Sequence, residues 1–433
     1  MKLDESAEFK SLFTPELKRL ASLFSQYHHE LRIAGGAVRD LLMGMKPADV
    51  DFASTATPQE MHEMFEKEQI RTFNKKGEKH GTVTCRINDK ENFEITTLRV
   101  DLVCDGRRAE VQWTTDWFLD ANRRDLTVNS MFLGLDGTVY DYFDGVRDLE
   151  ERRLRFVGDA VSRIQEDYLR IMRYFRFYGR LAQQPADHES DTLSAITHNA
   201  HGLENVSGER LWQEFRKTVV GNFAPALLRT MHQCDLLPYL GLPKQVDLDE
   251  FEEVCNRSKK MKPEPMTLVS ALLPNEEALY ALDRRLKLSN QERLLGVFVI
   301  LYRNAEQIRV GRESVKFFKD LILDEGGDKN PQAFERVFEL LKYLGQDDLL
   351  SELRQWQPPK FPVSGFDMAQ AGVKRGPGVK RTLDFLFELW KESHYQLGHD
   401  QLLARVSEAD QSDIPEKRRK AVEKMVLKRK VSK

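Results

Sequence analysis

The chain has 433 residues, of which 41% are hydrophobic and 31% charged, and its formal net charge is −3 at pH 7. This length is more than one ordinary hydrophobic core supports, so we expect two to four domains. No apolar run approaches the roughly 20 residues of a membrane-spanning helix, and the first residues, MKLDESAEFK, resemble neither a signal peptide nor an Arg-rich transit peptide. The sequence therefore predicts an intracellular, cytoplasmic protein without a membrane partner.

A net charge near zero does not exclude nucleic-acid binding, because local patches of charge decide it. Residues 416–433 carry nine Lys or Arg and two Glu, which is typical either of a solvated terminus or of a tail that contacts phosphates. The four cysteines lie far apart and form no C-x-x-C motif, so we expect reduced thiols and no structural zinc.

The first 150 residues or so mix strands with helices. ELRIAG (30–35) has the composition of a short strand, GAVRDLLMG (36–44) has the apolar spacing of a helix, and DVDFAS (49–54) is expected to be the next strand. Thr57-Pro58-Gln59-Glu60 is a capping box with proline at the first helical position, so another helix begins there.

Two further strands are predicted at 81–87 and 93–100, and Asp136-Gly137 between two apolar runs indicates a hairpin. Beyond about residue 150 the helical period dominates, and QPPKFPVSG (357–365) is expected to be a linker. The sequence therefore predicts an α+β head followed by a long helical array.

The stretch GGAVRDLLMGMKPADVDF (35–52) combines a glycine pair with two closely spaced acids. On a strand, Asp49 and Asp51 would point to the same face with Cα atoms about 6–7 Å apart. Such a pair could hold two divalent metals for an in-line phosphoryl displacement, and oxygen ligands suit Mg²⁺. Before a helix, Gly36 would let backbone N–H groups approach a triphosphate, and Arg39 could reach a phosphate.

Each of these signals is weak alone, because D-x-D is common by chance and a glycine pair often makes only a tight turn. The order strand, glycine pair, helix, strand, D-x-D favours the palm of a nucleotidyltransferase. The chain has no G-x-x-x-x-G-K-[ST] motif, so a P-loop kinase or ATPase is not supported.

A second group of polar residues lies in RIQEDYLRIMRYFRFYGR (163–180). On one continuous helix, Arg170, Arg173 and Arg176 would share a broad face, with Asp167 one step before them. The simplest interpretation is a basic helix face with an intrahelical Asp–Arg pair. The alternative is a face that binds a ligand.

The motifs GGAVRD, DVDF, RRDLTVNSM, DGTVYDYFDGVRDL, EDYLRIMRYFRF and SGERLWQEF, together with PVSGFDMAQAG, resemble those of the class II CCA-adding enzymes (CCA tRNA nucleotidyltransferases) of the animal type. They occur in family order over nearly the whole chain. The resemblance implies a polymerase-beta-like nucleotidyltransferase palm with a mixed sheet and an all-α neck, body and tail. The expected domains are the head at 1–150, the neck at 151–245, the body at 246–356 and a tRNA-contacting tail at 357–433.

The resemblance also implies the reaction: addition of C, C and A to the 3′ acceptor end of tRNA from CTP and ATP, with release of pyrophosphate and no template. It makes Asp49 and Asp51 the catalytic ligands of two Mg²⁺ ions. The nucleotide would be bound by Gly36, Arg39, Arg124, Asp167, Arg170, Arg173 and Arg176. Mitochondria become a second expected compartment beside the cytoplasm, and the protein is expected to be a monomer or a homodimer.

The pair Asp167 and Arg170 has a physical logic of its own. A carboxylate only accepts hydrogen bonds and a guanidinium only donates them. C and A both present an exocyclic amine beside an acceptor ring nitrogen, whereas U and G present the reverse pattern. Each mismatched buried contact costs about 1–3 kcal/mol, so the pair would accept C or A and reject U and G.

Two further segments have a functional and a plain interpretation. The polar stretch LVCDGRRAE (102–110) is either a lever for the change from C to A, as the resemblance suggests, or a surface loop. SGERLWQEF (207–215) either braces the nucleotide-binding helix through Glu209 and Arg210 or is only a capped helix start.

Three other functions remain open from the sequence. A poly(A) polymerase of the same family would use ATP alone, a non-catalytic tRNA-binding protein would lack turnover, and a small-molecule nucleotidyltransferase would not need the long helical array.

Overall fold

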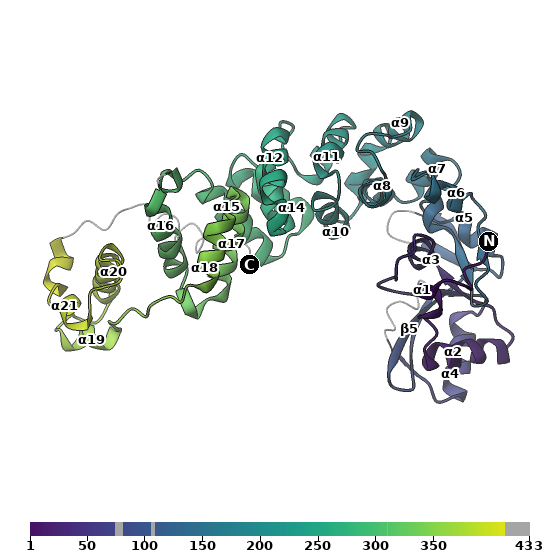
Figure 1. The fold of residues 1–433 in the computed structure, drawn as a ribbon, viewed down its shortest axis with the longest axis horizontal. Coiled ribbons are helices and arrows are strands. Elements are labelled where there is room, and N and C mark those ends of the chain that lie inside the picture. The colour runs from purple at the N-terminus through teal and green to yellow at the C-terminus, as the bar shows by residue number, and fades with distance from the viewer. Residues whose placement is uncertain (74–80, 105–108, 310, 412–433) are drawn as a thin grey trace. The chain divides into compact units, whose positions relative to one another are not determined.

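The computed structural model describes residues 1–73, 81–104, 109–309 and 311–411 (Figure 1). The chain forms two compact units, the first comprising Met1–Arg303 with Lys342–Gly345 and the second Asn304–Leu341 with Gln346–Lys433. None of the helices in the described residues combines the length and the apolar composition needed to cross a bilayer. The four-part division into head, neck, body and tail stays a prediction.

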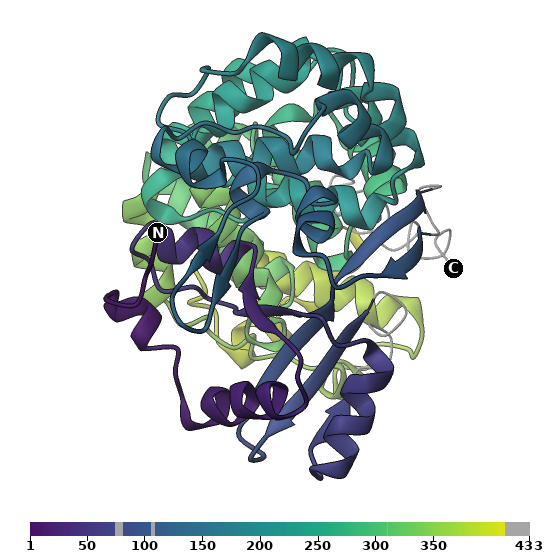
Figure 2. The same ribbon diagram turned by 90° about the vertical axis from the view of Figure 1, so that its right-hand side faces the viewer.

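A seven-stranded mixed sheet organises the N-terminal half of the first unit (Figure 2). Its strand order is β3-β4-β5-β2-β1-β8-β9, and β2 runs parallel to β5 while the other neighbours are antiparallel. The strands are β1 Leu31–Ala34, β2 Asp51–Ser54, β3 Arg71–Phe73, β4 Thr82–Ile87, β5 Glu91–Thr97, β8 Phe132–Gly134 and β9 Val139–Tyr140. The predicted mixed sheet and the hairpin at Asp136-Gly137 are confirmed.

One face of this sheet carries the main core. Helices α2 (Pro15–Gln26), α3 (Gly36–Leu42) and α4 (Pro58–Lys67) bury apolar side chains against Ile33, Phe52 and Ile95. Thr57 and Glu60 form the predicted capping box at the start of α4. Because side chains alternate along a strand, burial of Phe52 on this face leaves Asp51 on the opposite, open face.

Two of the predicted strands differ from the structure. The chain bends at residues 48–49, and β2 starts only at the pair Asp51↔Glu94, so Asp49 precedes the strand instead of lying on it. The strand predicted at 93–100 is two strands. β5 ends at Thr97, and β6 (Arg99–Cys104) turns away to pair with β7 (Ala109–Trp113) in a separate ribbon.

The ribbon also corrects the surface loop predicted at 102–110, because most of that stretch is strand. Residues 105–108, to which the lever hypothesis refers, lie outside the described residues, as does the basic segment 416–433. Cys85, Cys234 and Cys255 are free thiols, as predicted.

Helices make up the rest of the first unit. They are α1 Ala7–Lys10, α5 Trp117–Asn122, α6 Gly145–Glu150, α7 Ala160–Glu166, α8 Leu169–Leu181, α9 Ser190–His198, α10 Gly208–Val219, α11 Ala224–Gln233, α12 Leu248–Ser258, α13 Pro265–Val269, α14 Glu276–Leu286 and α15 Asn290–Tyr302. The predicted change from a mixed to a helical chain near residue 150 is confirmed.

The prediction of one helix across 163–180 is wrong. Asp167 has extended backbone angles (φ −153°, ψ 103°) between α7 and α8, and its carboxylate accepts a hydrogen bond from the Leu169 N–H at 3.1 Å. An Asp that bonds the N–H two residues on favours the start of a new helix over continuation of the old one. Asp167 therefore stands before α8 and not on its surface.

The second unit is helical in its described residues and has its own core. Its helices are α16 Gly311–Asp324, α17 Pro331–Leu344 (whose last residues belong to the first unit), α18 Asp347–Gln355, α19 Gly365–Gln370, α20 Pro377–Glu392 and α21 His399–Leu403. Val363, Met368, Leu386, Trp390 and Leu402 form its main buried cluster. Residues 356–364 contain no helix or strand and lie within the second unit, so the linker between domains predicted at 357–365 stays a prediction.

Candidate active site

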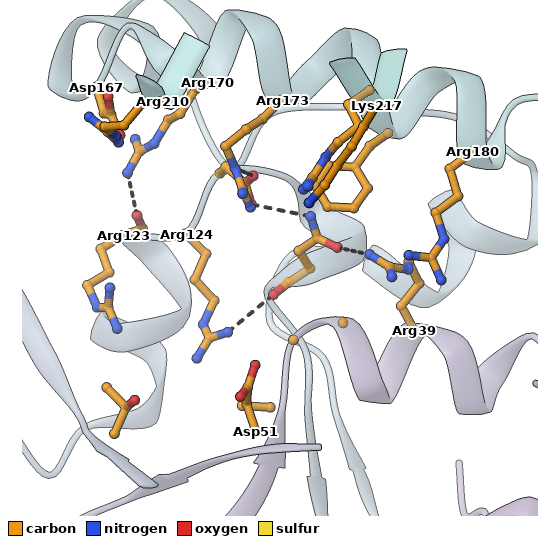
Figure 3. A pocket seen from close by; sticks show the side chains of 18 of the residues that line it. Arg39, Asp51, Arg123, Arg124, Asp167, Arg170, Arg173, Arg180, Arg210 and Lys217 are labelled. Carbon is orange, nitrogen blue, oxygen red and sulfur yellow. Dashed lines mark hydrogen bonds and ion pairs between the residues drawn. The ribbon is translucent and has the colours of Figure 1, made fainter. Parts of the chain in front are cut away.

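A cleft of about 1430 Å³ lies in the first unit between the open face of the sheet and helices α8 and α10 (Figure 3). It brings together most of the residues that the sequence singled out. Those in its lining are Gly36, Arg39, Asp51, Arg124, Asp167, Arg170, Arg173 and Arg176. Asp49 is not in the lining, but its charge contributes to a raised pKa at Asp51, so the two carboxylates are near each other.

The glycine pair makes the turn between β1 and α3. Gly35 has a φ of +63°, a left-handed conformation that favours glycine. A Cβ atom at Gly35 would lie 3.0 Å from the Arg124 guanidinium, so this position also keeps room for that side chain. Among the described residues no side chain caps the start of α3, which leaves its first N–H groups available to an anion in the cleft.

Asp51 is the first residue of β2 and projects from the sheet toward the cleft (Figure 3). Partial burial raises the pKa of the Asp51 carboxyl, the charge of Asp49 raises it further, and Arg124 opposes both effects. Two neighbouring carboxylates that repel each other suit a bound cation. No group of three His, Cys, Asp or Glu side chains in the described residues is placed to hold a metal.

Glu94 is a candidate active-site residue that the sequence analysis missed. It is the in-register partner of Asp51 on the parallel strand β5 and also lines the cleft. Partners in register point to the same face of a sheet. The alternation of Phe93, Glu94, Ile95 and Thr96 places Glu94 on the polar face, but no local pattern shows that β5 lies beside β2.

Arg124 is held in place by a buried acid. It donates to the Asp120 carboxylate at 3.0 Å and to the Asn129 carbonyl at 3.4 Å. Burial alone would raise the pKa of Asp120, but Arg124 and Arg123 outweigh this effect and hold it below its usual range. Asp120 therefore stays charged and orients both arginines at the cleft.

Arg39 is less accessible to a ligand than the sequence suggested. Its side chain is buried, and it donates to Asp40 at 2.8 and 3.0 Å and to the Asn129 side chain at 2.6 Å. Asp40 also accepts two hydrogen bonds from Arg180, at 2.8 and 3.0 Å. Arg39 is thus a fixed positive charge beneath the glycine turn, and Asp40 connects it to α8.

The side chains of Asp167 and Arg170 do not pair with each other in the described residues, so the predicted intrahelical ion pair is wrong; the two residues are joined only by the Arg170 N–H, which donates to the Asp167 carbonyl at 2.9 Å. Asp167 forms an ion pair with Arg210 at 2.7 Å. Arg170 forms one with Glu166 at 2.6 Å and donates to the carbonyl of Arg123 at 2.7 Å.

The predicted start of a capped helix is confirmed, because the Ser207 side chain caps α10. Arg210 of this helix contacts Asp167, but a brace for α8 through Glu209 and Arg210 stays a prediction. Glu166 and Arg210 line the cleft as well. The sequence analysis did not place Glu166 in the site, although its position beside Asp167 was a local signal.

The other two arginines of α8 are also ion-paired. Arg173 donates to Asp125 at 2.6 Å, which joins α8 to the segment after α5. Arg176 lies 2.9 Å from Glu214 of α10 and 4.2 Å from the centre of the Phe177 ring. These contacts, with the Arg180–Asp40 pair, hold α8 along one wall of the cleft.

The sheet, the acid pair and the basic wall together define a nucleotidyltransferase. Residues 31–155 match the family described as Poly A polymerase head domain, and residues 188–246 match that described as Probable RNA and SrmB-binding site of polymerase A. The mitochondrial CCA tRNA nucleotidyltransferase 1 of Homo sapiens is 50% identical over 94% of this chain and 93% of its own length. That of Danio rerio is 51% identical over the same shares.

Solved structures agree with this fold. The CCA-adding enzyme of Bacillus stearothermophilus in complex with CTP covers 92% of this chain and 98% of its own, with 24% identity and a TM-score of 0.70. The enzyme of Thermotoga maritima complexed with tRNA covers 94% and 98%, with 18% identity and a TM-score of 0.65. The chain belongs to the family of CCA tRNA nucleotidyltransferases, and the predicted polymerase-beta-like head with a helical remainder is confirmed.

Proposed function

We propose that this nucleotidyltransferase adds C, C and A to the 3′ end of tRNA from CTP and ATP without a template. The observation that carries the proposal is the pair Asp49 and Asp51 beside a cleft whose opposite wall holds Asp167 and Arg170, in a chain with about 50% identity to CCA tRNA nucleotidyltransferases over 94% of its length. A poly(A) polymerase, the rival function, would have the same head domain, but these relatives are named as CCA tRNA nucleotidyltransferases.

In the proposed reaction the 3′ hydroxyl of tRNA attacks the α-phosphorus of the bound nucleotide. A new P–O bond forms, the proton of the hydroxyl passes to solvent, the bond between the α-phosphorus and the oxygen of the β-phosphate breaks, and pyrophosphate leaves. Asp49 and Asp51 supply hard oxygen ligands, which fit Mg²⁺. Two Mg²⁺ ions held there would supply Lewis-acid stabilisation of the attacking and leaving oxygens. Arg124 and the uncapped start of α3 would hold the phosphates by donated hydrogen bonds.

The base would be selected at the start of α8. Asp167 accepts from Arg210 and from the Leu169 N–H in this structure. A carboxylate has about four acceptor positions, so it retains capacity for the exocyclic amine of C or A. Arg210 holds Asp167 and Glu166 holds Arg170, so the hydrogen-bonding edge that these two residues present would be rigid. A rigid edge favours rejection of U and G over adjustment to them.

A basic patch of the second unit supports tRNA as the partner. Lys374, Arg375, Lys380 and Arg381 are exposed between the end of α19 and the first turns of α20. Within the described residues none of the four side chains has an ion pair or hydrogen bond. Unpaired surface cations of this density suit a phosphate backbone. We propose that this patch contributes to tRNA binding, and that the protein acts in mitochondria, as its relatives are named.

One assay tests the proposed activity. The protein is incubated with Mg²⁺, labelled tRNA lacking CCA, and CTP, ATP or both. We expect two nucleotides added with CTP alone and one more when ATP is also present. Long tails from ATP alone would indicate a poly(A) polymerase, and tRNA binding without extension would indicate a non-catalytic protein.

A further inference from the structure

The positive charges that line the cleft are almost all compensated. Among the described residues, nine arginines line it, and each has a carboxylate partner within ion-pair distance. Lys217 of α10 also lines the cleft and is exposed, yet no ion pair or hydrogen bond engages it in the described part of the chain. Lys217 is thus the cation whose charge is least neutralised by the protein.

The position of Lys217 follows from the helical period. Arg210, Glu214 and Lys217 are spaced i, i+4 and i+7, so they share one face of α10. Arg210 is paired with Asp167 and Glu214 with Arg176. Lys217 comes at the last turn of this face, and in Figure 3 its side chain points into the cleft.

The neighbourhood of Lys217 differs from the region proposed for the nucleotide. Val220, which is 50% exposed, lines the cleft together with Gly221 and Asn222 just beyond the end of α10. Arg170 and Arg180 are ten residues apart on α8, which is about 15 Å along the axis. The base-selecting residues are at the start of α8, and Arg180 of the cleft lining is near its end.

The cleft is large enough for a second occupant beside the nucleotide. Its volume of about 1430 Å³ exceeds the range of about 300–1,000 Å³ typical of small-ligand sites. The reaction also needs the attacking hydroxyl about 3–3.5 Å from the phosphorus, so the last nucleotides of tRNA must share the cleft. An uncompensated lysine beside an exposed apolar side chain suits a backbone phosphate with an adjacent sugar or base.

We infer that Lys217, with Val220 beside it, binds the backbone phosphate of the terminal nucleotides of tRNA and so positions the attacking 3′ end. The inference rests on the proposed function. The cleft would then contain two kinds of cationic side chain. The arginines, held by carboxylates, shape the nucleotide site, and Lys217, which has no such partner in the described residues, binds the tRNA.

The test compares Lys217→Ala with Lys217→Arg and wild type. For tRNA ending in CC with ATP, and for tRNA lacking CCA with CTP, we expect Lys217→Ala to raise the KM for tRNA about five- to tenfold. The KM values for CTP and ATP stay unchanged. Binding of tRNA without nucleotide weakens equally, with a salt slope shallower by about one. Lys217→Arg restores most of the affinity, because it retains the charge.

Lys18→Ala is the matched control, because Lys18 is an exposed lysine of α2 and is not among the residues that line the cleft. A rise in the KM for CTP or ATP instead of tRNA would assign Lys217 to the triphosphate and overturn the inference, as would unchanged tRNA binding. Failure of the wild type to extend tRNA would instead overturn the proposed function. Thermal unfolding of Lys217→Ala at the wild-type temperature excludes a folding defect.

Discussion

The acid pair at the start of β2 contributes little to the core. The side chains of Asp49 and Asp51 both reach solvent, and neither carboxylate has an ion pair or hydrogen bond among the described residues. Their removal should therefore change chemistry without changing the fold.

We predict that Asp49→Asn and Asp51→Asn each reduce incorporation of both CTP and ATP by about a thousandfold or more, because metal stabilisation of the transition state is worth several kcal/mol. The temperature of thermal unfolding should stay at the wild-type value. Chelation of Mg²⁺ in the wild type should reproduce the loss, and wild-type turnover in either variant would exclude the assignment.

Selection of the base makes a second prediction at this scale. Asp167→Ala should reduce discrimination against UTP and GTP by up to about 1–3 kcal/mol, the cost of one mismatched buried contact. Arg170→Ala should act in the same direction. It should also lower the free energy of unfolding, because Arg170 is buried and donates to two backbone carbonyls.

Incorporation ratios for the four nucleotides on one tRNA measure this selectivity. Asp191 is exposed in the first turn of α9, so the variant Asp191→Ala is a control for the loss of an acidic side chain outside the cleft. Reduced rates with unchanged ratios would mean that the pair only positions the phosphates.

The residues of the site differ in how far the sequence could predict them. Asp49, Asp51 and Arg39 belong to short motifs whose spacing carries the signal. Glu94 was missed because its role depends on the parallel register with β2. The contact of Asp167 with Arg210 joins residues 43 positions apart, and no local spacing determines which acidic side chain pairs with which arginine.

At the scale of elements, capping chemistry was the reliable signal. The helices α4 and α10 begin where Thr57 and Ser207 predict. The break between α7 and α8 was missed because the helical pattern of apolar residues continues through Asp167, while a single side-chain bond to Leu169 starts the new helix. The ribbon of β6 and β7 was missed because its pairing crosses a stretch whose polar composition indicated a loop.

The packing of His188 against helix α8 predicts how the stability of the fold depends on pH. His188 packs on its far side, where its ring centre is 3.9 Å from that of Tyr178 and its Nδ1 atom is 2.9 Å from the Tyr174 hydroxyl. Burial lowers the pKa of His188 to about 4. The folded state therefore disfavours protonation, while the unfolded chain binds a proton near pH 6.5.

The contribution of neutral, buried His188 to the free energy of unfolding is therefore fully present above about pH 6.5 and is lost as pH falls from there toward 4. The free energy of unfolding, measured by urea titration, should decrease over this window in the wild type. His188→Gln should show a smaller decrease, because it cannot titrate. An equal slope in both proteins would show that another group is responsible.

At the scale of the whole molecule, the two compact units carry different parts of the proposed function. The first contains the cleft and its paired charges. The second contains the basic patch of Lys374, Arg375, Lys380 and Arg381. The net charge of −3 hides this distribution, because acids elsewhere compensate for the patch. Composition alone could therefore not decide whether the protein binds nucleic acid.

Replacing these four cations together by alanine should weaken tRNA binding without changing the chemistry. For every phosphate that the variant no longer neutralises, the plot of log affinity against log salt should become shallower by about 0.7–0.9, while the turnover number at saturating tRNA stays at the wild-type value. Filter binding across a salt series and single-turnover extension measure the two quantities. The double variant Lys329→Ala with Arg405→Ala removes exposed cations from other elements of the same unit and should leave the slope unchanged. A quadruple variant with wild-type affinity and slope would remove the patch from the tRNA-binding surface, whereas a loss of turnover at saturation would place it in the reaction itself.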